Sequence, residues 1–278
     1  MPTIVDAQVH IWLPDSSERP WPKDGRVKPH LDGGFSAAQL LALMDQAGVD
    51  RAVLVPPSWE GERIDYVIDA TRRWPDRFVA MARIAADDPA LPGHLRAWRD
   101  QGLAGARLTF TRPAERAWLS NGTTDWLWAE AEALGMPVML HGTAGMDNID
   151  AIATRHPRLK IIVDHMGLYQ IKSDDPEFAP ALARTRGVAR HPNVHVKLTS
   201  LPHYSVEAYP HADLRPHLRE LIAAFGARRC FWGTDITKLL AHCGYRDCVE
   251  HVLGLDFLTA EDQEWILGRG LLECLGWK

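Results

Sequence analysis

The sequence predicts an α/β fold, a closed (β/α)₈ barrel of the TIM type. Strand-like and helix-like segments alternate along all 278 residues. The strand-like segments are short, β-branched and apolar on both faces, as expected for parallel strands between helices and a packed barrel centre. Four of them end on His10, His141, His165 or Asp235. These side chains converge only if the strands are parallel and closed, and such a barrel carries its active site at the carboxyl ends of its strands.

Local signals set the limits of each element. Ser36 is a good N-cap for the first helix and Gly48 ends it. Later helices stop at Pro75, Gly102 and Gly135. In chain order, strands are expected at residues 5–10, 51–55, 78–84, 105–110, 137–141, 161–165, 194–198 and 230–235, and helices at 37–46, 64–74, 91–101, 124–134, 149–155, 177–189 and 214–225. Further helices at 263–267 and 271–275 predict a distorted barrel with long βα loops and extra C-terminal helices.

Length and charge narrow the function. A barrel of this kind usually has about 250 residues, so residues 1–278 are expected to form one domain. The net charge of -5 argues against nucleic acid or an anionic membrane as the main partner. No apolar run approaches the roughly 18 residues of a membrane span, and a strand that starts near Ile4 leaves no room for a signal peptide. We expect a cytoplasmic enzyme that acts on a small molecule; association into a homo-oligomer is left open.

Two further features bear on the site. Residues 11–35 form a loop far longer than the roughly 2–6 residues of most βα connections. It carries Trp12, Trp21 and His30, so we expect a lid or specificity loop, with a surface excursion or subunit contact as the alternative.

The four cysteines lie in the last fifth of the chain without a CxxC pair, which predicts reduced, mostly buried thiols rather than a structural zinc site: Cys230, Cys243, Cys248 and Cys274.

The run DAQVHIW, from Asp6 to Trp12, resembles the opening D-x-H-x-H-x-W/F segment of the amidohydrolase-2 family, a branch of the amidohydrolase superfamily of (β/α)₈ enzymes. Further matches follow in order: LHG at 140–142, VDHMG at 163–167, VKL at 196–198, WGTD at 232–235 and ILGRGLL at 266–272, the last without the family's usual asparagine. Each motif is weak alone, but their order and strand placement are specific and cover nearly the whole chain. Within the family, the chain is most similar to lactonases of sugar lactones, muconolactones and pyrone dicarboxylates.

The resemblance implies a His-x-His pair on the first strand, but Gln8 stands at its first position. Zinc sites use such a pair because alternate residues of a strand face the same side. Gln8 offers only an amide oxygen, a poor ligand for zinc. His10, His141 and Asp235 remain as three ligands, enough for a catalytic zinc with an open position. We therefore expect either no required cofactor, as in some lactonases of this family, or one divalent metal, preferably zinc.

The implied reaction is attack of an activated water on a lactone carbonyl. Asp235 is expected to be the general base that takes the proton of the water. His10, His141 and His165 are expected to hydrogen-bond the carbonyl and stabilise the developing oxyanion. A bound zinc ion would take over the polarising role.

Cationic and polar side chains are expected to hold a lactone or carboxylic acid substrate. Arg107, among small and apolar residues of its strand, can bind a carboxylate through two parallel hydrogen bonds. Lys197 and Arg83 lie on their strands in a similar way. An internal salt bridge with Asp6, Asp164 or Glu130 is the alternative for all three cations. The full set of predicted substrate-binding residues is Arg107, Lys197, Gln8, Trp12 and Tyr204.

Other functions stay open at this stage. A metal-dependent decarboxylase of an aromatic or muconate-type acid would contain bound divalent metal, and Gln8 argues against it. Amide hydrolysis is disfavoured because the fourth strand offers Arg107 and no group to bridge two metals. A degenerate barrel that only binds ligands would have no reason to keep an acid and three histidines at its strand tips.

Overall fold

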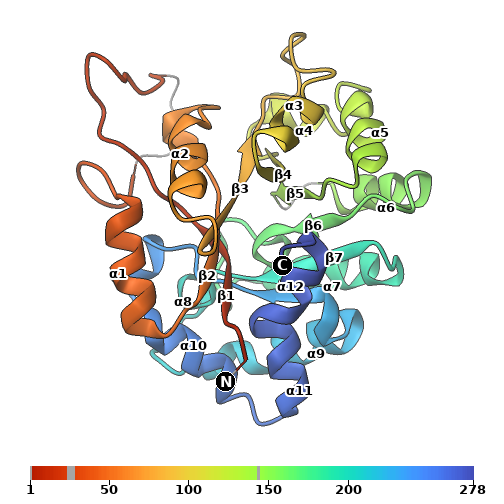
Figure 1. Ribbon diagram of the computed structural model, residues 1–278. Coiled ribbons are helices and arrows are strands. Elements are labelled where there is room, and N and C mark those ends of the chain that lie inside the picture. The colour runs from red at the N-terminus through yellow and green to blue at the C-terminus, as the bar shows by residue number, and fades with distance from the viewer. Residues whose placement is uncertain (1, 24–28, 143–144) are drawn as a thin grey trace.

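The computed structural model describes residues 2–23, 29–142 and 145–278. Eight parallel strands form the barrel that the sequence predicts (Figure 1). Each strand pairs with the next in chain order: β1 (Val5–Val9), β2 (Arg51–Leu54), β3 (Phe78–Arg83), β4 (Leu103–Thr109), β5 (Val138–His141), β6 (Ile161–Val163), β7 (Val194–Leu198) and β8 (Cys230–Trp232). Val9 forms a parallel bridge with Ile236, just beyond β8. This bridge brings the first and last strands together and nearly closes the barrel.

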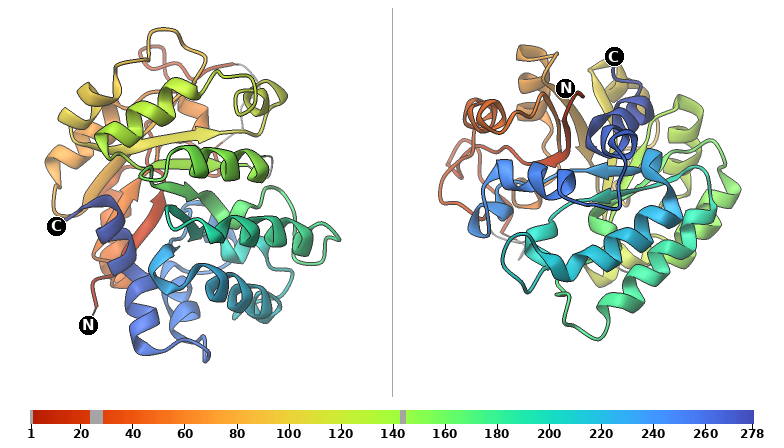
Figure 2. Two further views of the ribbon diagram at one scale, coloured as in Figure 1. Left: turned by 90° about the vertical axis from the view of Figure 1, so that its right-hand side faces the viewer. Right: turned by 90° about the horizontal axis from the view of Figure 1, so that it is seen from below.

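Helices lie outside the strands (Figure 2). The main ones are α1 (Ala37–Ala47), α2 (Asp65–Arg73), α3 (Leu95–Asp100), α4 (Pro113–Ala117), α5 (Asp125–Leu134), α6 (Met146–Arg155), α7 (Phe178–Gly187), α8 (Leu201–Tyr204), α9 (Arg215–Phe225) and α10 (Tyr245–Leu253). Short 3₁₀ segments are η1 (Ser58–Glu60), η2 (Asp164–Gly167), η3 (Val188–Arg190), η4 (Ala212–Leu214), η5 (Ala227–Arg229) and η6 (Lys238–Ala241). Both predicted ends of α1 are confirmed. The Ser36 side chain accepts a hydrogen bond from the Gln39 N–H, and Gly48 ends the helix with a φ of 73°.

Six of the predicted strands end earlier than expected: β1 to β4 by one residue, β6 by two and β8 by three. β6 stops at Val163 and β8 at Trp232, so His165 and Asp235 lie beyond the strands and not on their last residues. The φ angles of His165 and Asp235 are 51° and 62°, and Ser200, after β7, has a φ of 60°. This left-handed backbone cannot continue a strand and is uncommon for residues with a side chain. Strained backbone of this kind concentrates at functional sites.

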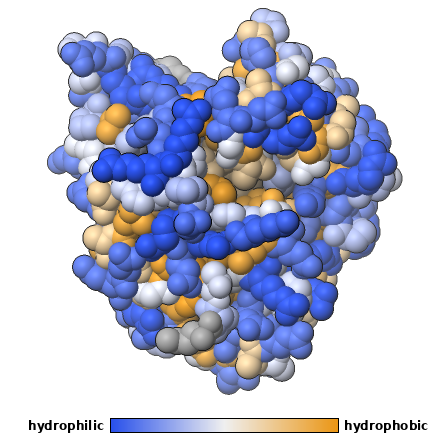
Figure 3. All heavy atoms as spheres, viewed as in Figure 1, coloured by the Kyte–Doolittle hydropathy of each residue, from blue (hydrophilic) through white to orange (hydrophobic). Residues whose placement is uncertain are grey.

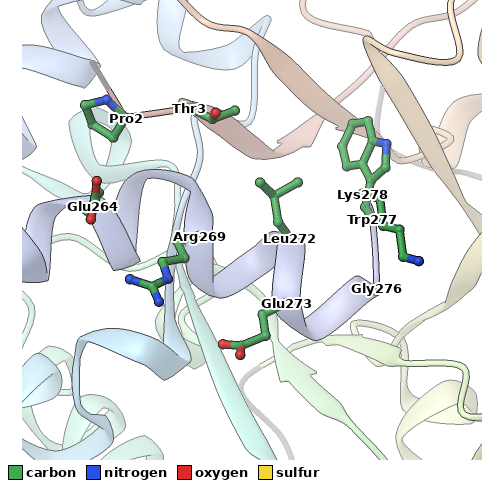
Figure 4. A pocket seen from close by; sticks show the side chains of 9 residues that line it. All are labelled: Pro2, Thr3, Glu264, Arg269, Leu272, Glu273, Gly276, Trp277 and Lys278. Carbon is green, nitrogen blue, oxygen red and sulfur yellow. The ribbon is translucent and has the colours of Figure 1, made fainter.

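The amino end of the barrel is closed by the C-terminal helices. The chain runs through α11 (Ala260–Glu264), a π-helical turn (Trp265–Arg269) and α12 (Gly270–Leu275). Leu271 and Cys274 of α12 pack against the apolar barrel interior, which includes Val5, Met139 and Phe231. A cavity of about 670 Å³ opens here beside both chain ends (Figure 4). Its described lining contains acidic and basic side chains but no histidine or cysteine, so it is not where the predicted residues meet.

Hydrophilic side chains cover most of the face seen in Figure 3, with hydrophobic residues showing between them. Among the described residues, no helix has both the length and the apolar character needed to cross a lipid bilayer.

Candidate active site

The four residues predicted to be catalytic line one cavity of about 270 Å³ at the carboxyl ends of the strands. His10 follows β1, His141 ends β5, His165 follows β6 and Asp235 follows β8. The other described lining residues include His30, Trp59, Arg83, Arg107, Arg112, Glu115, Tyr169, Ser200, Tyr204 and Lys238. The barrel thus brings together side chains from distant parts of the sequence, as the strand tips predict.

Asp235 is held on both carboxylate oxygens by neighbouring side chains. Its Oδ1 lies 2.9 Å from His10 Nε2, and its Oδ2 accepts a hydrogen bond of 2.6 Å from Ser200 Oγ. Burial would raise the pKa of Asp235, but the electrostatic interaction with His165 and the hydrogen bonds from His10 and Ser200 outweigh burial and hold this pKa well below its usual range. Asp235 is therefore an ionised carboxylate at neutral pH.

Both ring nitrogens of His10 face acceptors. Nδ1 lies 2.7 Å from the carbonyl oxygen of Val55, and Nε2 lies 2.9 Å from the Asp235 carboxylate. A carbonyl oxygen and a carboxylate only accept hydrogen bonds. His10 is therefore held between the backbone at the end of β2 and the Asp235 carboxylate.

Gln8 links three residues beneath the cavity through hydrogen bonds. Its Oε1 accepts a hydrogen bond of 2.7 Å from Lys197 Nζ, which fixes the orientation of the amide because an ammonium group can only donate. Its Nε2 then faces His165 Nε2 at 3.3 Å and Asp235 Oδ1 at 3.4 Å. Gln8 and Lys197 are fully buried, so both lie beneath the cavity and not on its surface.

His165 has no N–H left for a substrate. Its Nε2 accepts from the Gln8 amide, so its Nδ1 carries the proton and donates to Thr199 Oγ1 at 2.7 Å. Burial lowers the pKa of His165 to about 4, against the opposing charges of Asp235 and Asp164. His165 is therefore a neutral ring that orients its neighbours.

His141 is the histidine whose hydrogen-bonding capacity remains open. Its ring lies edge-on to that of His165, with centroids 4.9 Å apart. Its Nδ1 is buried and has no hydrogen-bond partner among the described residues. Burial, followed by the charge of Arg107, lowers the pKa of His141 well below its usual value. A neutral imidazole on the cavity wall with one ring nitrogen not used by the described residues is suited to contact a substrate.

Arg107 and Lys197 share one buried aspartate. Asp164 Oδ2 accepts a hydrogen bond from Arg107 Nε at 3.0 Å, and Asp164 Oδ1 forms an ion pair with Lys197 Nζ at 2.9 Å. Burial would raise the pKa of Asp164, but the two cations outweigh it and lower this pKa. The alternative of an internal salt bridge is thus confirmed for both cations, although Arg107 also lines the cavity.

The two predicted aromatic contacts differ in position. Trp12 is fully buried, donates from Nε1 to the carbonyl oxygen of Gly33 at 2.8 Å, and lies behind Trp59, with ring centroids 5.1 Å apart. Trp59 lines the cavity and Trp12 does not, so the prediction of a direct contact for Trp12 is corrected to support of Trp59. Tyr204 does line the cavity and donates to the carbonyl oxygen of Leu168 at 3.1 Å.

The sequence analysis missed several residues of the site. Ser200 lies two residues beyond β7 and Lys238 three residues beyond Asp235, so proximity to a strand end could have indicated both. His30, from the long loop, also lines the cavity, whereas residues 24–28 of that loop lie outside the described part of the chain. Nothing in the sequence distinguishes Trp59 from the other tryptophans.

A possible metal-ligand group in the structure differs from the predicted one. His141, Asp164 and His165 each offer a ligand atom, and these atoms lie within 4.8 Å of one another. The predicted set of His10, His141 and Asp235 is divided, because His10 and Asp235 bind each other while His141 lies against His165. In the observed group, Asp164 is already held by two cations and both ring nitrogens of His165 have partners. The group therefore does not fit a metal ion in this arrangement.

Known relatives share most of the chain. Residues 5–269 match the family model described as amidohydrolase. An L-fucono-1,5-lactonase of Burkholderia ambifaria is 30% identical over 91% of this chain and 90% of its own. A 4-sulfomuconolactone hydrolase of Hydrogenophaga intermedia is 28% identical over 93% of this chain and 83% of its own.

Solved structures share the fold at lower sequence identity. A probable 2-pyrone-4,6-dicarboxylic acid hydrolase of Acinetobacter baumannii, with citric acid bound, has a TM-score of 0.78 and 17% identity over 99% of this chain and 100% of its own. An amidohydrolase of Burkholderia multivorans with bound zinc has a TM-score of 0.78 and 20% identity over 99% of each chain. A 5-carboxyvanillate decarboxylase of Sphingomonas paucimobilis has a TM-score of 0.70 and 15% identity over 99% of each chain. From the family match over residues 5–269, together with the barrel and the motifs at its strand ends, the chain belongs to the amidohydrolase family of enzymes.

Proposed function

We propose that this enzyme is a hydrolase that opens a small lactone with a water activated by Asp235. The observation that carries the proposal is an ionised carboxylate on the cavity wall, held by His10 and Ser200. The lactonase and muconolactone hydrolase relatives support this reaction. Asp235 takes a proton from water as the water oxygen attacks the lactone carbonyl.

The oxyanion formed in this step needs a partner. His10 and His165 use both of their ring nitrogens within the protein, so His141 is assigned as the histidine that donates to this oxygen. The Arg107 side chain lines the same cavity and adds positive charge. Collapse of the intermediate breaks the ring C–O bond, and the leaving oxygen takes the proton that Asp235 had accepted. The product is an open hydroxy acid or its keto tautomer.

The substrate is proposed to be anionic. The described lining carries four cations, Arg83, Arg107, Arg112 and Lys238, and two acids, Glu115 and Asp235. This local excess of positive charge contrasts with the net charge of -5 of the chain. Arg112 is paired with Glu115 at 2.8 Å, Arg83 lies 3.8 Å from Glu62, and Arg107 shares Asp164 with Lys197, so Lys238 is the cation assigned to the charge of the substrate. A lactone with a carboxylate or sulfonate substituent suits this cavity.

A metal ion is not required in the proposed mechanism. The Gln8 amide nitrogen lies between His165 and Asp235 and donates toward both. A metal ion bound by both of these residues would have to occupy the position of this N–H group. The charge of the Asp164 carboxylate is already balanced by Arg107 and Lys197, so Asp164 is a poor ligand for an additional metal cation.

We expect that chelators leave the activity intact. After dialysis against EDTA and 1,10-phenanthroline, kcat with the best lactone should stay within about twofold of the untreated enzyme, because no step uses metal-bound water. The metal content is measured by plasma mass spectrometry on the same sample. Inactivation that zinc alone reverses would contradict the metal-free mechanism.

Lys238→Gln tests the anionic substrate. Burial lowers the pKa of Lys238, while the charge of Asp235 opposes this shift, so its ammonium group is only partly screened by water. Removing a charge-assisted contact should raise KM for a carboxylated lactone by about tenfold. A neutral lactone of the same ring size serves as the matched substrate and should keep its KM. Equal losses for both substrates would show that Lys238 has no role in substrate choice.

The alternative is a decarboxylase of an aromatic or muconate-type acid, as in the similar structure from Sphingomonas. One assay separates the two reactions. Lactones and aromatic acids are incubated with the enzyme, and acid release is followed with a pH indicator while carbon dioxide is trapped. Proton release from lactones without carbon dioxide supports the hydrolase, whereas carbon dioxide from an aromatic acid supports the decarboxylase.

A further inference from the structure

Two cysteines outside the active site lie close together at the side of the barrel. Cys243 follows η6 and Cys248 lies in α10, and their Sγ atoms are 3.5 Å apart. Both line a void of about 10 Å³ next to Trp232 and Gly233 of the β8 end. Cys248 is buried, while Cys243 is only partly buried and can be reached by a small solute. Both are free thiols in this structure.

The local fold holds the two sulfurs in this position. The N–H of Cys243 donates to the carbonyl oxygen of Leu239 at 3.1 Å, and the N–H of Gly244 donates to Asp247 Oδ2 at 2.8 Å at the start of α10. The loop that precedes α10 therefore places Cys243 next to the first helical turn, which contains Cys248. A disulfide has an S–S distance of about 2.05 Å, so the sulfurs need to approach by roughly 1.5 Å. Cys243 lies outside the helix, where its side chain can rotate.

The two thiols are not equivalent. The hydrogen bond from Cys248 lowers the pKa of Cys243, against the opposing effects of burial and the charge of Asp247. The pKa of Cys248 is raised by the same hydrogen bond and by burial. The thiolate is the form that attacks an oxidant. Cys243 is thus the nucleophile of the pair and Cys248 the second thiol that resolves it.

We propose that Cys243 and Cys248 are an oxidation site that closes to a reversible intrachain disulfide when the protein meets hydrogen peroxide. The Cys243 thiolate attacks one peroxide oxygen, breaks the O–O bond and becomes a sulfenic acid, while the released hydroxide takes up a proton to form water. The Cys248 sulfur then attacks the Cys243 sulfur and expels hydroxide, which leaves as water with the Cys248 proton. The two thiols lose two electrons in total, and the peroxide is reduced to two molecules of water. A dithiol reductant reverses the change.

Peptide mapping of the full-length protein tests the site. Trypsin cleaves after Lys238, Arg246 and Arg269, so Cys243 and Cys248 fall into the separate peptides 239–246 and 247–269. After a brief treatment with hydrogen peroxide, the intact chain should lose the mass of two hydrogen atoms, and the two peptides should stay joined until dithiothreitol is added. Cys243→Ser should abolish the link, and Cys274→Ser, at another buried cysteine, should retain it.

Three outcomes would overturn the proposal. In the first, Cys243 gains two oxygen atoms and no link forms. In the second, the link joins Cys230 or Cys274. In the third, the purified protein carries a tightly bound zinc ion that protects the thiols, with His211 and His251 as additional ligands; both histidines line the same void with an unpartnered Nε2 among the described residues. Each outcome is visible without an activity assay.

Discussion

Asp235→Asn should lower kcat by more than about a hundredfold, the scale expected for the loss of a general base. The asparagine keeps the size of the side chain and can still hydrogen-bond His10 and Ser200, but its amide cannot accept the proton of the attacking water. The measurement is steady-state hydrolysis of the best lactone by purified enzyme.

The matched control is Asp174→Asn, which makes the same change at an exposed aspartate. Both variants should show the circular dichroism spectrum and melting temperature of the parent to within a few degrees. If Asp235→Asn kept more than a tenth of the parent kcat, another group would have to be the base. An early melt of this variant would instead indicate that the contacts of the Asp235 carboxylate with His10 and Ser200 hold the fold.

The largest effect on stability is expected for Asp164→Asn. Asp164 is fully buried and is shared by Arg107 and Lys197, of which Lys197 is also fully buried. The asparagine would leave two buried cations without a counter-charge. Removing one partner of a buried ionic group costs about 3–5 kcal/mol in the free energy of unfolding. Denaturant titration followed by tryptophan fluorescence measures this loss.

The comparison is Glu177→Gln, which breaks the exposed pair between Arg184 and Glu177, 3.5 Å apart. Exposed ion pairs contribute little, so this variant should unfold at nearly the parental midpoint. The pH dependence has a definite sign. Because the pKa of Asp164 is lowered in the folded state, its stabilising contribution is complete above its unfolded pKa of about 3.9 and is lost in stronger acid. The difference between parent and Asp164→Asn should therefore be constant near neutral pH and shrink only in strong acid.

The sequence was sufficient for the barrel and for the meeting of its strand tips. The alternation of strand and helix signals depends on local composition, which the sequence shows directly. Polar residues at the ends of several apolar strands indicated that these strands are parallel and form a closed barrel. The convergence of His10, His141, His165 and Asp235 could therefore be predicted. The roles of these residues could not. Which nitrogen of a histidine remains available depends on partners from other strands, such as Val55 for His10 and Gln8 for His165.

The predicted substrate contacts show a similar limit. Alternation along a strand places a residue inside the barrel but does not give its depth. Lys197 and Gln8 point inward as predicted, yet both lie below the cavity, while Lys238 reaches it from a loop. Trp12 and Trp59 are indistinguishable by residue type, and only their packing decides that Trp59 faces the cavity.

The position of Gln8 also has an evolutionary consequence. In the genetic code, glutamine and histidine codons differ only at the third base. A single nucleotide substitution therefore separates the present amide, which donates toward His165 and Asp235, from an imidazole at the same point of β1. During evolution, one substitution can therefore replace the internal hydrogen-bond network beneath the cavity by a site with an additional nitrogen ligand. No intermediate residue is needed.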